Sequence, residues 1–305
     1  MRAVRRKLGS LGFTLIELLV VVGVITILAG TAIVGLRGAR EGAITARTMN
    51  FANSVRTQLI LGEVGNWNFD SSALGTGGIT DSSGLNNHGT LHLGTADNTT
   101  LADAQADGVV RRALSFDGQD DFVTIRDVDW FDGRRPWTIS FWMNSGAFRP
   151  TWDWIISDET TTQEPMIIVR RADGNIIHLA LRQAGGAWIM YVKIPFTPNA
   201  WHHIIFTYNG TELIGYRDGA FIGRTSSTLT PGFSTRNLEF GRRSGGGGHW
   251  NGLLDEVQIY NEALRAGEVQ MRYAQGLEGL LARGMISQEE FEQRMNNFQQ
   301  LTTDN

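Results

Sequence analysis

The sequence predicts a mainly β protein: a two-sheet antiparallel jellyroll sandwich, preceded by a long N-terminal α-helix and followed by a short C-terminal helical segment. Beyond Gly62, apolar residues alternate with a period of two in several short segments, and Asn-Gly and Asp-Gly pairs separate these segments. Glycine is frequent, at 37 residues, and proline is rare, at 6, which favours a β domain with many turns. Residues 13–34 form one continuous apolar run, which favours a helix before the β domain.

The N-terminal run has the length of a membrane-spanning helix. Its 22 residues, Phe13 to Val34, would span about 33 Å as a helix. Four cations and no acid precede the run, so we expect the first residues to stay in the cytoplasm. Glu17 lies inside the run, where a charge costs roughly 2.5–3.5 kcal/mol. Because a charge is unfavourable in this position, we expect Glu17 to have a functional role.

The helix is expected to continue past the apolar run. Apolar or small residues then recur at spacings of three and four, typical of one face of an amphipathic helix. These residues are Ile44, Thr48, Phe51, Val55 and Leu59. We expect one helix over residues 13–62, with its second half packed on a globular head.

The residues Gly12-Phe13-Thr14-Leu15-Ile16-Glu17 resemble the prepilin N-terminal methylation motif of type IV pilins and type II secretion pseudopilins. The resemblance implies that prepilin peptidase cuts after Gly12, that Phe13 is methylated, and that Glu17 pairs with the N-terminal amine of a neighbouring subunit. The implied partners are copies of the chain or other pilins in a filament. The implied location is a single pass through the inner membrane, with the head outside the cytoplasm, in the periplasm or at the cell surface after assembly. The alternative is a plain signal anchor with a tolerated glutamate.

The strands of the head are expected at several alternating segments. Residues 137–143 place Trp137, Ile139, Phe141 and Met143 on one face. Residues 176–182 and 187–193 are expected to pair, and residues 201–208 are apolar on both faces, as in a central strand of stacked sheets. This spacing of strands and turns favours a sandwich or a jelly roll.

Several segments in order resemble the LamG-like jellyroll of the concanavalin A-like lectin/glucanase superfamily. They are WNFD (67–70), ALSFDGQDDFVTI (113–125), WTISFW (137–142), WHHIIFTYNG (201–210) and WNGLLDEVQIYNEAL (250–264). The expected domains are a leader (1–12), a transmembrane or filament helix (13–62), a jellyroll (63–273) and a helical tail (274–305). This fold hosts lectins, adhesins and glycanases, so the fold alone does not set the function.

Composition and carboxylate spacing exclude several functions. The chain has no cysteine, which excludes disulfides, cysteine-based zinc sites and thiol catalysis. Its formal charge is −4 and no basic stripe recurs after the N-terminus, so nucleic acid is not an expected partner. Glycanases of the resembled superfamily place two acids at alternating positions of one strand. Asp120-Asp121 and Asp255-Glu256 are adjacent and so face opposite ways in a strand, which predicts that the protein is not an enzyme.

Domains of the resembled superfamily often hold one Ca²⁺ ion, which requires several carboxylate and carbonyl oxygens. The candidate ligands are Asp70, Asp117, Asp121 and Asp255. Asp70 and Asp255 would approach each other if the first and last strands pair. The alternative is that these aspartates cap turns by accepting backbone N–H groups.

Sugar recognition commonly uses exposed aromatic rings. The candidates are Trp130, Trp152 and Trp250, which lie in expected loops. His202 and His203 lie in a strand without an acid at ligand spacing, and we expect them to be packing residues.

The C-terminal tail is expected to form a helical hairpin. Ser287 and Glu290 match a capping box, and Phe291, Met295 and Phe298 form an apolar stripe. The hairpin either docks on the head or joins subunits. The whole chain is therefore interpreted as a pilin-like or pseudopilin-like subunit that displays a lectin-like head for adhesion or for binding a carbohydrate or cell-surface ligand. The alternatives are a structural pseudopilin that binds no sugar and a membrane-tethered glycan hydrolase.

Overall fold

The computed structural model describes residues 62–70, 78–126, 128–131, 133–146, 152–158, 167–172, 174–183, 187–232, 237–244 and 246–303. The predicted leader, the predicted long helix and the candidate residues Gly12, Phe13 and Glu17 lie outside these residues. In the described part of the chain, no helix has the length and apolar character needed to cross a membrane.

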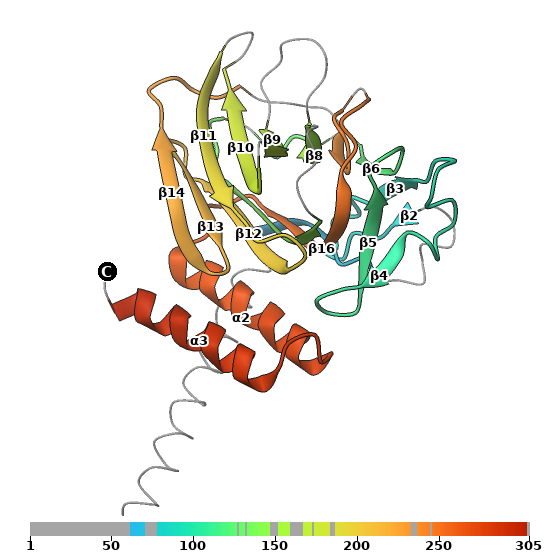
Figure 1. Ribbon diagram of the computed structural model, residues 1–305. Helices are drawn as coiled ribbons and strands as arrows, with labels where there is room; N and C mark the ends of the chain where they lie inside the picture. The colour runs from blue at the N-terminus through green and yellow to red at the C-terminus, as the bar shows by residue number, and fades with distance from the viewer. Residues whose placement is uncertain are drawn as a thin grey trace, which may run out of the picture. The chain divides into compact units, whose positions relative to one another are not determined.

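Two antiparallel eight-stranded sheets form the domain (Figure 1). The order of the first is β14 (Ala220–Ser226), β13 (Glu212–Arg217), β12 (Trp201–Tyr208), β7 (Trp137–Ser145), β16 (Asn251–Tyr260), β5 (Arg112–Asp117) and β4 (Gln105–Asp107), with β1 (Glu63–Trp67) paired to β16. The order of the second is β11 (Trp188–Pro195), β10 (Ile176–Arg182), β9 (Ile167–Ala172), β8 (Asp153–Ser157), β15 (Leu238–Phe240), β6 (Phe122–Ile125), β3 (Gly89–His92) and β2 (Gly78–Ile79). The predicted jellyroll sandwich is confirmed.

The core lies between the two sheets. The predicted inward face of β7 is confirmed, because Trp137, Ile139, Phe141 and Met143 are all buried there. All eight residues of β12 are buried, as predicted for a central strand. Fully burying one such side chain contributes roughly 1.5–3 kcal/mol relative to leaving it exposed.

A helical hairpin covers the other face of the first sheet. It consists of α2 (Ala266–Ala282) and α3 (Gln288–Thr303), below β12 in Figure 1. Tyr273 and Leu277 of α2 form a second apolar cluster with Trp142 and Trp201 of the sheet. The hairpin therefore docks on the head. Helix α2 is continuous through Tyr273, so it includes the residues on both sides of the expected boundary between the jellyroll and the tail.

The predicted start of α3 is confirmed at its cap. The Glu290 N–H donates to Ser287 Oγ at 3.1 Å. Phe291 and Met295 pack against the cluster beneath the first sheet. These two residues of the predicted stripe thus face the head.

Candidate functional site

The outer face of the β10–β11 hairpin exposes two large aromatic side chains. Tyr191 is 57% exposed and Trp188 is 36% exposed. Three other residues of β11 point into the core: Met190, Val192 and Ile194. Because strand side chains alternate, burying these three leaves Tyr191 and Lys193 on the outer face. Exposed apolar groups gathered on one face are typical of a binding surface.

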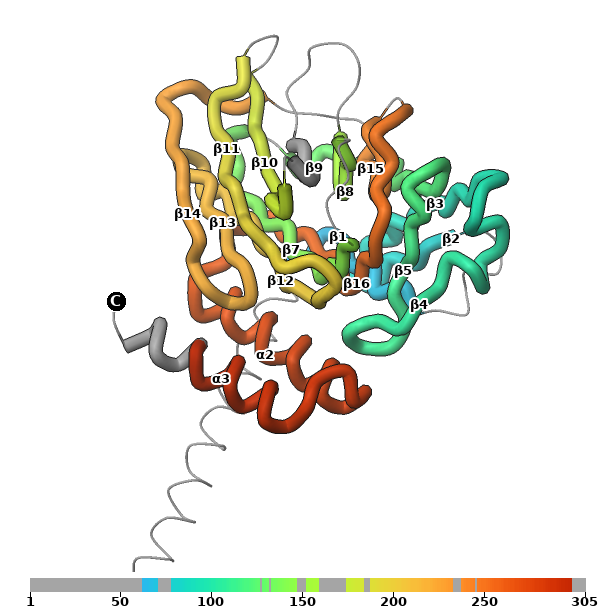
Figure 2. The backbone as a smooth tube through the Cα atoms, in the orientation of Figure 1, coloured from blue at the N-terminus to red at the C-terminus, as the bar shows by residue number. Residues whose placement is uncertain are grey.

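A hollow of about 230 Å³ lies on this face. Its lining residues are His178, Ala180, Trp188, Tyr191 and Lys193. Ala180 pairs across the strands with Tyr191, and its methyl group leaves space beside the ring. The pairing of the two strands shifts register between Leu181 and Arg182, and beyond this shift Trp188 also lines the hollow. Figure 2 shows the hairpin at the end of its sheet, next to β13 and β14.

Two cations accompany the rings. The Arg182 Cζ atom lies 4.9 Å from the centroid of the Trp188 ring, and the Lys193 Nζ atom lies 6.0 Å from that of Tyr191. Both distances are within the range of cation–π attraction. We call the set His178, Ala180, Arg182, Trp188, Tyr191 and Lys193 the aromatic–cationic face. It combines flat apolar surfaces with hydrogen-bond donors, which suits a ligand with both an apolar ring face and polar substituents.

The structure places the three predicted tryptophans differently. Trp250 is fully buried, 5.7 Å from the Phe116 ring, so its selection as a ligand-contacting residue is corrected. Its backbone N–H donates to the Gly241 carbonyl at 2.8 Å, and its ring lies in the core although the residue closely follows a glycine run. Trp130 packs against the core at 6.0 Å from Trp67. Trp152 is 43% exposed, just before β8.

Trp188 and Tyr191 were not among the predicted site residues. The sequence did predict the strand that carries them. The sequence did contain a signal for these residues. Met190, Val192 and Ile194 are enough to form the core-facing side of this strand, so Trp188 and Tyr191, next to Lys193, were candidates for the outer face. This alternation indicates exposed aromatic residues better than an expected position in a loop does.

A second cluster lies in the turn between β5 and β6. Asp117, Asp120 and Asp121, here called the carboxylate turn, each bring one oxygen within 4.8 Å of the others. One oxygen of each is already bonded: Asp117 accepts the Gln119 N–H, Asp120 the Thr95 N–H, and Asp121 the Asn98 amide. Gly118 provides the positive φ, 79°, that the turn requires.

The second oxygen of each carboxylate is buried and has no hydrogen-bond partner among the described residues: Asp117 Oδ2, Asp120 Oδ1 and Asp121 Oδ1. Burial raises the pKa of Asp121. Buried oxygens without a donor are costly, and three together match the preference of a hard cation such as Ca²⁺ for carboxylate ligands. The donor set of the carboxylate turn therefore fits the ion.

The four predicted metal ligands do not form a single site. Asp70 and Asp255 both bind the turn that precedes β5. Asp255 accepts the Val109 N–H at 2.6 Å, and Asp70 accepts the Arg112 N–H at 2.9 Å. Strands β1 and β16 pair as expected. The two aspartates stabilise a turn, whereas Asp120 joins Asp117 and Asp121 in the carboxylate turn.

The comparisons with known proteins bear on the fold around these sites. A family model described as "Concanavalin A-like lectin/glucanases superfamily" matches residues 117–270, just over half of the chain. The chain belongs to this superfamily. Comparison with curated proteins gives no match.

Solved structures agree with this superfamily fold. The binding domain of Paraclostridial Mosquitocidal Protein 1 is similar with a TM-score of 0.56 and 19% identity, over 72% of this chain and 53% of that one. Domain 4 of AbnA, a GH43 extracellular arabinanase from Geobacillus stearothermophilus, was solved in complex with arabinotriose. It is similar with a TM-score of 0.52 and 19% identity, over 68% of this chain and 97% of that one. The botulinum neurotoxin type G receptor binding domain is similar with a TM-score of 0.51 and 15% identity, over 70% of this chain and 51% of that one. The chain spans about half the length of the two toxin domains, and at these identities the likeness shows the fold.

The adjacent acids of this superfamily member do not form a pair across a cleft. Asp255 points to the turn before β5, and Glu256 lines a different cavity. Asp120 and Asp121 lie in a turn, where their oxygens converge. Two carboxylates that flank a sugar from opposite sides are needed for glycoside hydrolysis, and neither pair has this arrangement.

Glu256 lines a cavity of about 190 Å³ beneath α2, together with His203 and Arg272. Desolvation, followed by the charge of Asp70, raises the pKa of Glu256 to about 7. Burial lowers the pKa of His203 to about 3, so this imidazole is neutral at physiological pH. The His203 ring stacks on Trp142 and its Nε2 atom lies 2.9 Å from Ser140 Oγ.

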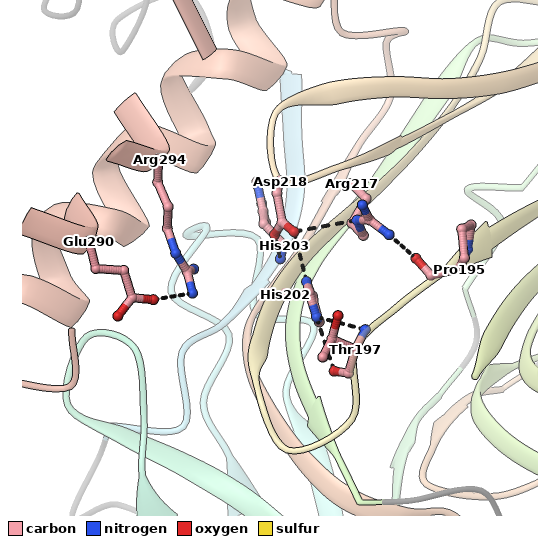
Figure 3. Close-up of polar contacts among 8 residues, drawn as sticks. All are labelled: Pro195, Thr197, His202, His203, Arg217, Asp218, Glu290 and Arg294. Atoms are coloured by element: carbon pink, nitrogen blue, oxygen red, sulfur yellow. Dashed lines mark hydrogen bonds and ion pairs between the residues drawn. The ribbon is translucent and has the colours of Figure 1, made fainter. Parts of the chain in front are cut away.

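His202 has an acidic partner, Asp218, which lies 16 residues further along the chain (Figure 3). Its Nδ1 lies 2.7 Å from Asp218 Oδ2, and its Nε2 lies 3.1 Å from the Thr197 amide nitrogen. Asp218 also accepts the His203 N–H at 3.0 Å and lies 3.5 Å from Arg217 Nε. Both ring nitrogens have partners, so His202 ties the β13–β14 turn to the segment after β11. The expectation that His202 lacks an acidic partner was wrong, although its structural role stands.

Proposed function

We propose that this protein is a pilin-like or pseudopilin-like subunit whose jellyroll head binds carbohydrate through the aromatic–cationic face. The observation that carries the binding proposal is the exposure of Trp188 and Tyr191 around one hollow. An arabinanase domain of similar fold was solved with arabinotriose, which supports a sugar as the ligand. No catalytic role is proposed, because Asp120 and Asp121 lie in one turn, Asp255 binds another turn, and Glu256 lines a cavity beneath α2.

The first test is glycan binding by the full chain in detergent, compared with its Tyr191→Ala variant. Removing the ring deletes the stacking surface, and we expect affinity to fall at least about tenfold, or about 1.4 kcal/mol. A glycan array followed by calorimetric titration measures this loss. Leu85→Ala is the matched control, because Leu85 is also 57% exposed and lies outside the hollow.

Trp152→Ala tests the location of the site. A loss of binding in this variant, together with wild-type affinity in Tyr191→Ala, would place the ligand at the loop before β8. Absence of any glycan ligand for the folded chain would favour the structural pseudopilin.

We further propose that Asp117, Asp120 and Asp121 hold Ca²⁺, which would neutralise the three converging carboxylates and rigidify the turn. At a Ca²⁺ concentration of 100 times Kd, we expect the ion to stabilise the fold by about 2.7 kcal/mol. Thermal unfolding with Ca²⁺, with Mg²⁺ and with chelator measures the effect. Asp120→Asn should abolish the Ca²⁺-dependent rise in Tm, whereas Asp103→Asn, an exposed aspartate outside the cluster, should retain it. Identical Tm values in Ca²⁺ and chelator would leave these aspartates with turn stabilisation alone.

The filament role rests on the motif at Gly12, Phe13 and Glu17. Glu17→Ala should leave membrane insertion intact and reduce assembly, because the buried carboxylate loses its pairing with a neighbouring N-terminus. Membrane fractionation checks that the variant still inserts, and electron microscopy measures the yield of filaments. Mass spectrometry of the mature chain should find residues 1–12 removed. Normal filaments from Glu17→Ala would contradict the assignment.

A further inference from the structure

The aromatic–cationic face is positively charged in a chain whose formal charge is negative. The chain has 31 acidic residues, yet no aspartate or glutamate occurs between Asp173 and Glu212, the segment that contains β10, β11 and β12. Over the same segment lie His178, Arg182 and Lys193. Lys193 is also the only lysine after Lys7. The sign of the charge on this face is therefore opposite to that of the chain as a whole.

The cations lie where they would meet a ligand on the rings. Lys193 lines the hollow with Tyr191 and Trp188, and no acid is among the described residues that line it. Arg182 lies over the Trp188 ring. The Asp218 carboxylate near the end of β11 is engaged by His202 and Arg217. A sugar stacked on Tyr191 would thus carry its substituents towards Lys193 without meeting a lining carboxylate.

From this arrangement we propose that the ligand of the aromatic–cationic face is an acidic saccharide, whose ring stacks on Tyr191 and whose carboxylate or sulfate group pairs with Lys193. The inference rests on the proposed carbohydrate binding and adds the class of sugar. A neutral sugar would stack on Tyr191 only. An acidic sugar would also form a charge-assisted hydrogen bond with Lys193, strengthened because the neighbouring ring excludes part of the water.

The same charges have a second physical explanation. Strand β11 ends its sheet, and lysine on an edge strand hinders pairing with another chain. That explanation predicts aggregation on removal of Lys193 and no change in sugar preference. The acidic-saccharide proposal predicts a change in preference in the monodisperse protein, so the two explanations are separable.

The decisive experiment uses the full chain in detergent with trigalacturonate and its fully methyl-esterified form, which share the same rings and differ in charge. A glycan array with neutral, uronate, sialylated and sulfated saccharides precedes it, and the best acidic ligand found there is titrated beside its neutral counterpart. We expect the acidic form to bind at least about tenfold more tightly, and this preference to shrink as salt rises from 0.05 to 0.5 M, since the Debye length falls from roughly 14 to 4 Å.

Lys193→Met should remove the preference and retain binding of the neutral form, and Tyr191→Ala should weaken both. Arg224→Met is the matched control, because it removes one exposed cation on β14. Equal affinities of the acidic and neutral forms, both dependent on Tyr191, would overturn this inference and leave carbohydrate binding in place. Absence of binding to every saccharide would overturn both.

Discussion

Trp250→Ala should lower the free energy of unfolding by about 3–5 kcal/mol. The side chain is fully buried immediately before β16 and packs on Phe116. Its removal leaves a cavity between the sheets that the surrounding strands cannot close. Urea unfolding at 25 °C, followed by far-UV circular dichroism, measures the loss.

Two further variants separate packing from other causes. The Trp250 Nε1 atom has no hydrogen-bond partner among the described residues, so Trp250→Phe loses volume without losing a bond and should cost clearly less than Trp250→Ala. Trp152→Ala is the exposed-tryptophan control and should change stability by less than about 1 kcal/mol. Equal stability of Trp250→Ala and the wild type would contradict the placement of this ring in the core.

The sandwich could be predicted because the alternation of apolar residues in its strands and the residues in its turns both favour it. In β7, one alternating set of residues enters the main core, and the opposite set includes Trp142, which α2 covers. Hairpins at Asn209-Gly210 and Asp218-Gly219 follow the expected turn chemistry. The order of strands in each sheet depends on pairings between segments far apart in sequence, which local alternation does not specify.

The site residues were harder to predict, because side-chain burial depends on those distant pairings. Trp250 follows a glycine run and was taken as a loop residue, yet β16 starts at the next residue and its ring enters the core. Asp120 was considered with Asp121 only as a catalytic pair and was not among the predicted metal ligands, yet inside the turn the oxygens of adjacent aspartates converge. His202 meets Asp218 only because β12 and β13 pair.

Glu256→Gln should stabilise the protein at pH 8 by about 3 kcal/mol and have little effect at pH 4. Desolvation raises the folded-state pKa of Glu256 from 4.5 to about 7, so the folded protein holds a proton that the unfolded chain releases between these values. The stability of the wild type therefore falls as pH rises from 4.5 to 7, and the cost is fully present above pH 7. The neutral amide avoids this cost.

The difference between the two proteins isolates Glu256 from His203. Burial lowers the pKa of His203 from 6.5 to about 3, which has the opposite effect: stability is lost as pH falls from 6.5 towards 3. Because both proteins contain His203, its contribution cancels when their unfolding free energies are subtracted at each pH. Burial is the largest cause of the raised pKa of Glu256; Asp70 and Glu63 raise the pKa further and Arg272 lowers it, so the size of the difference reports desolvation together with the nearby charges. Glu292→Gln, at an exposed position of α3, is the control for removing one carboxylate from the surface. A Glu256→Gln difference that is constant between pH 4 and 8 would mean that Glu256 titrates alike in the folded and unfolded states.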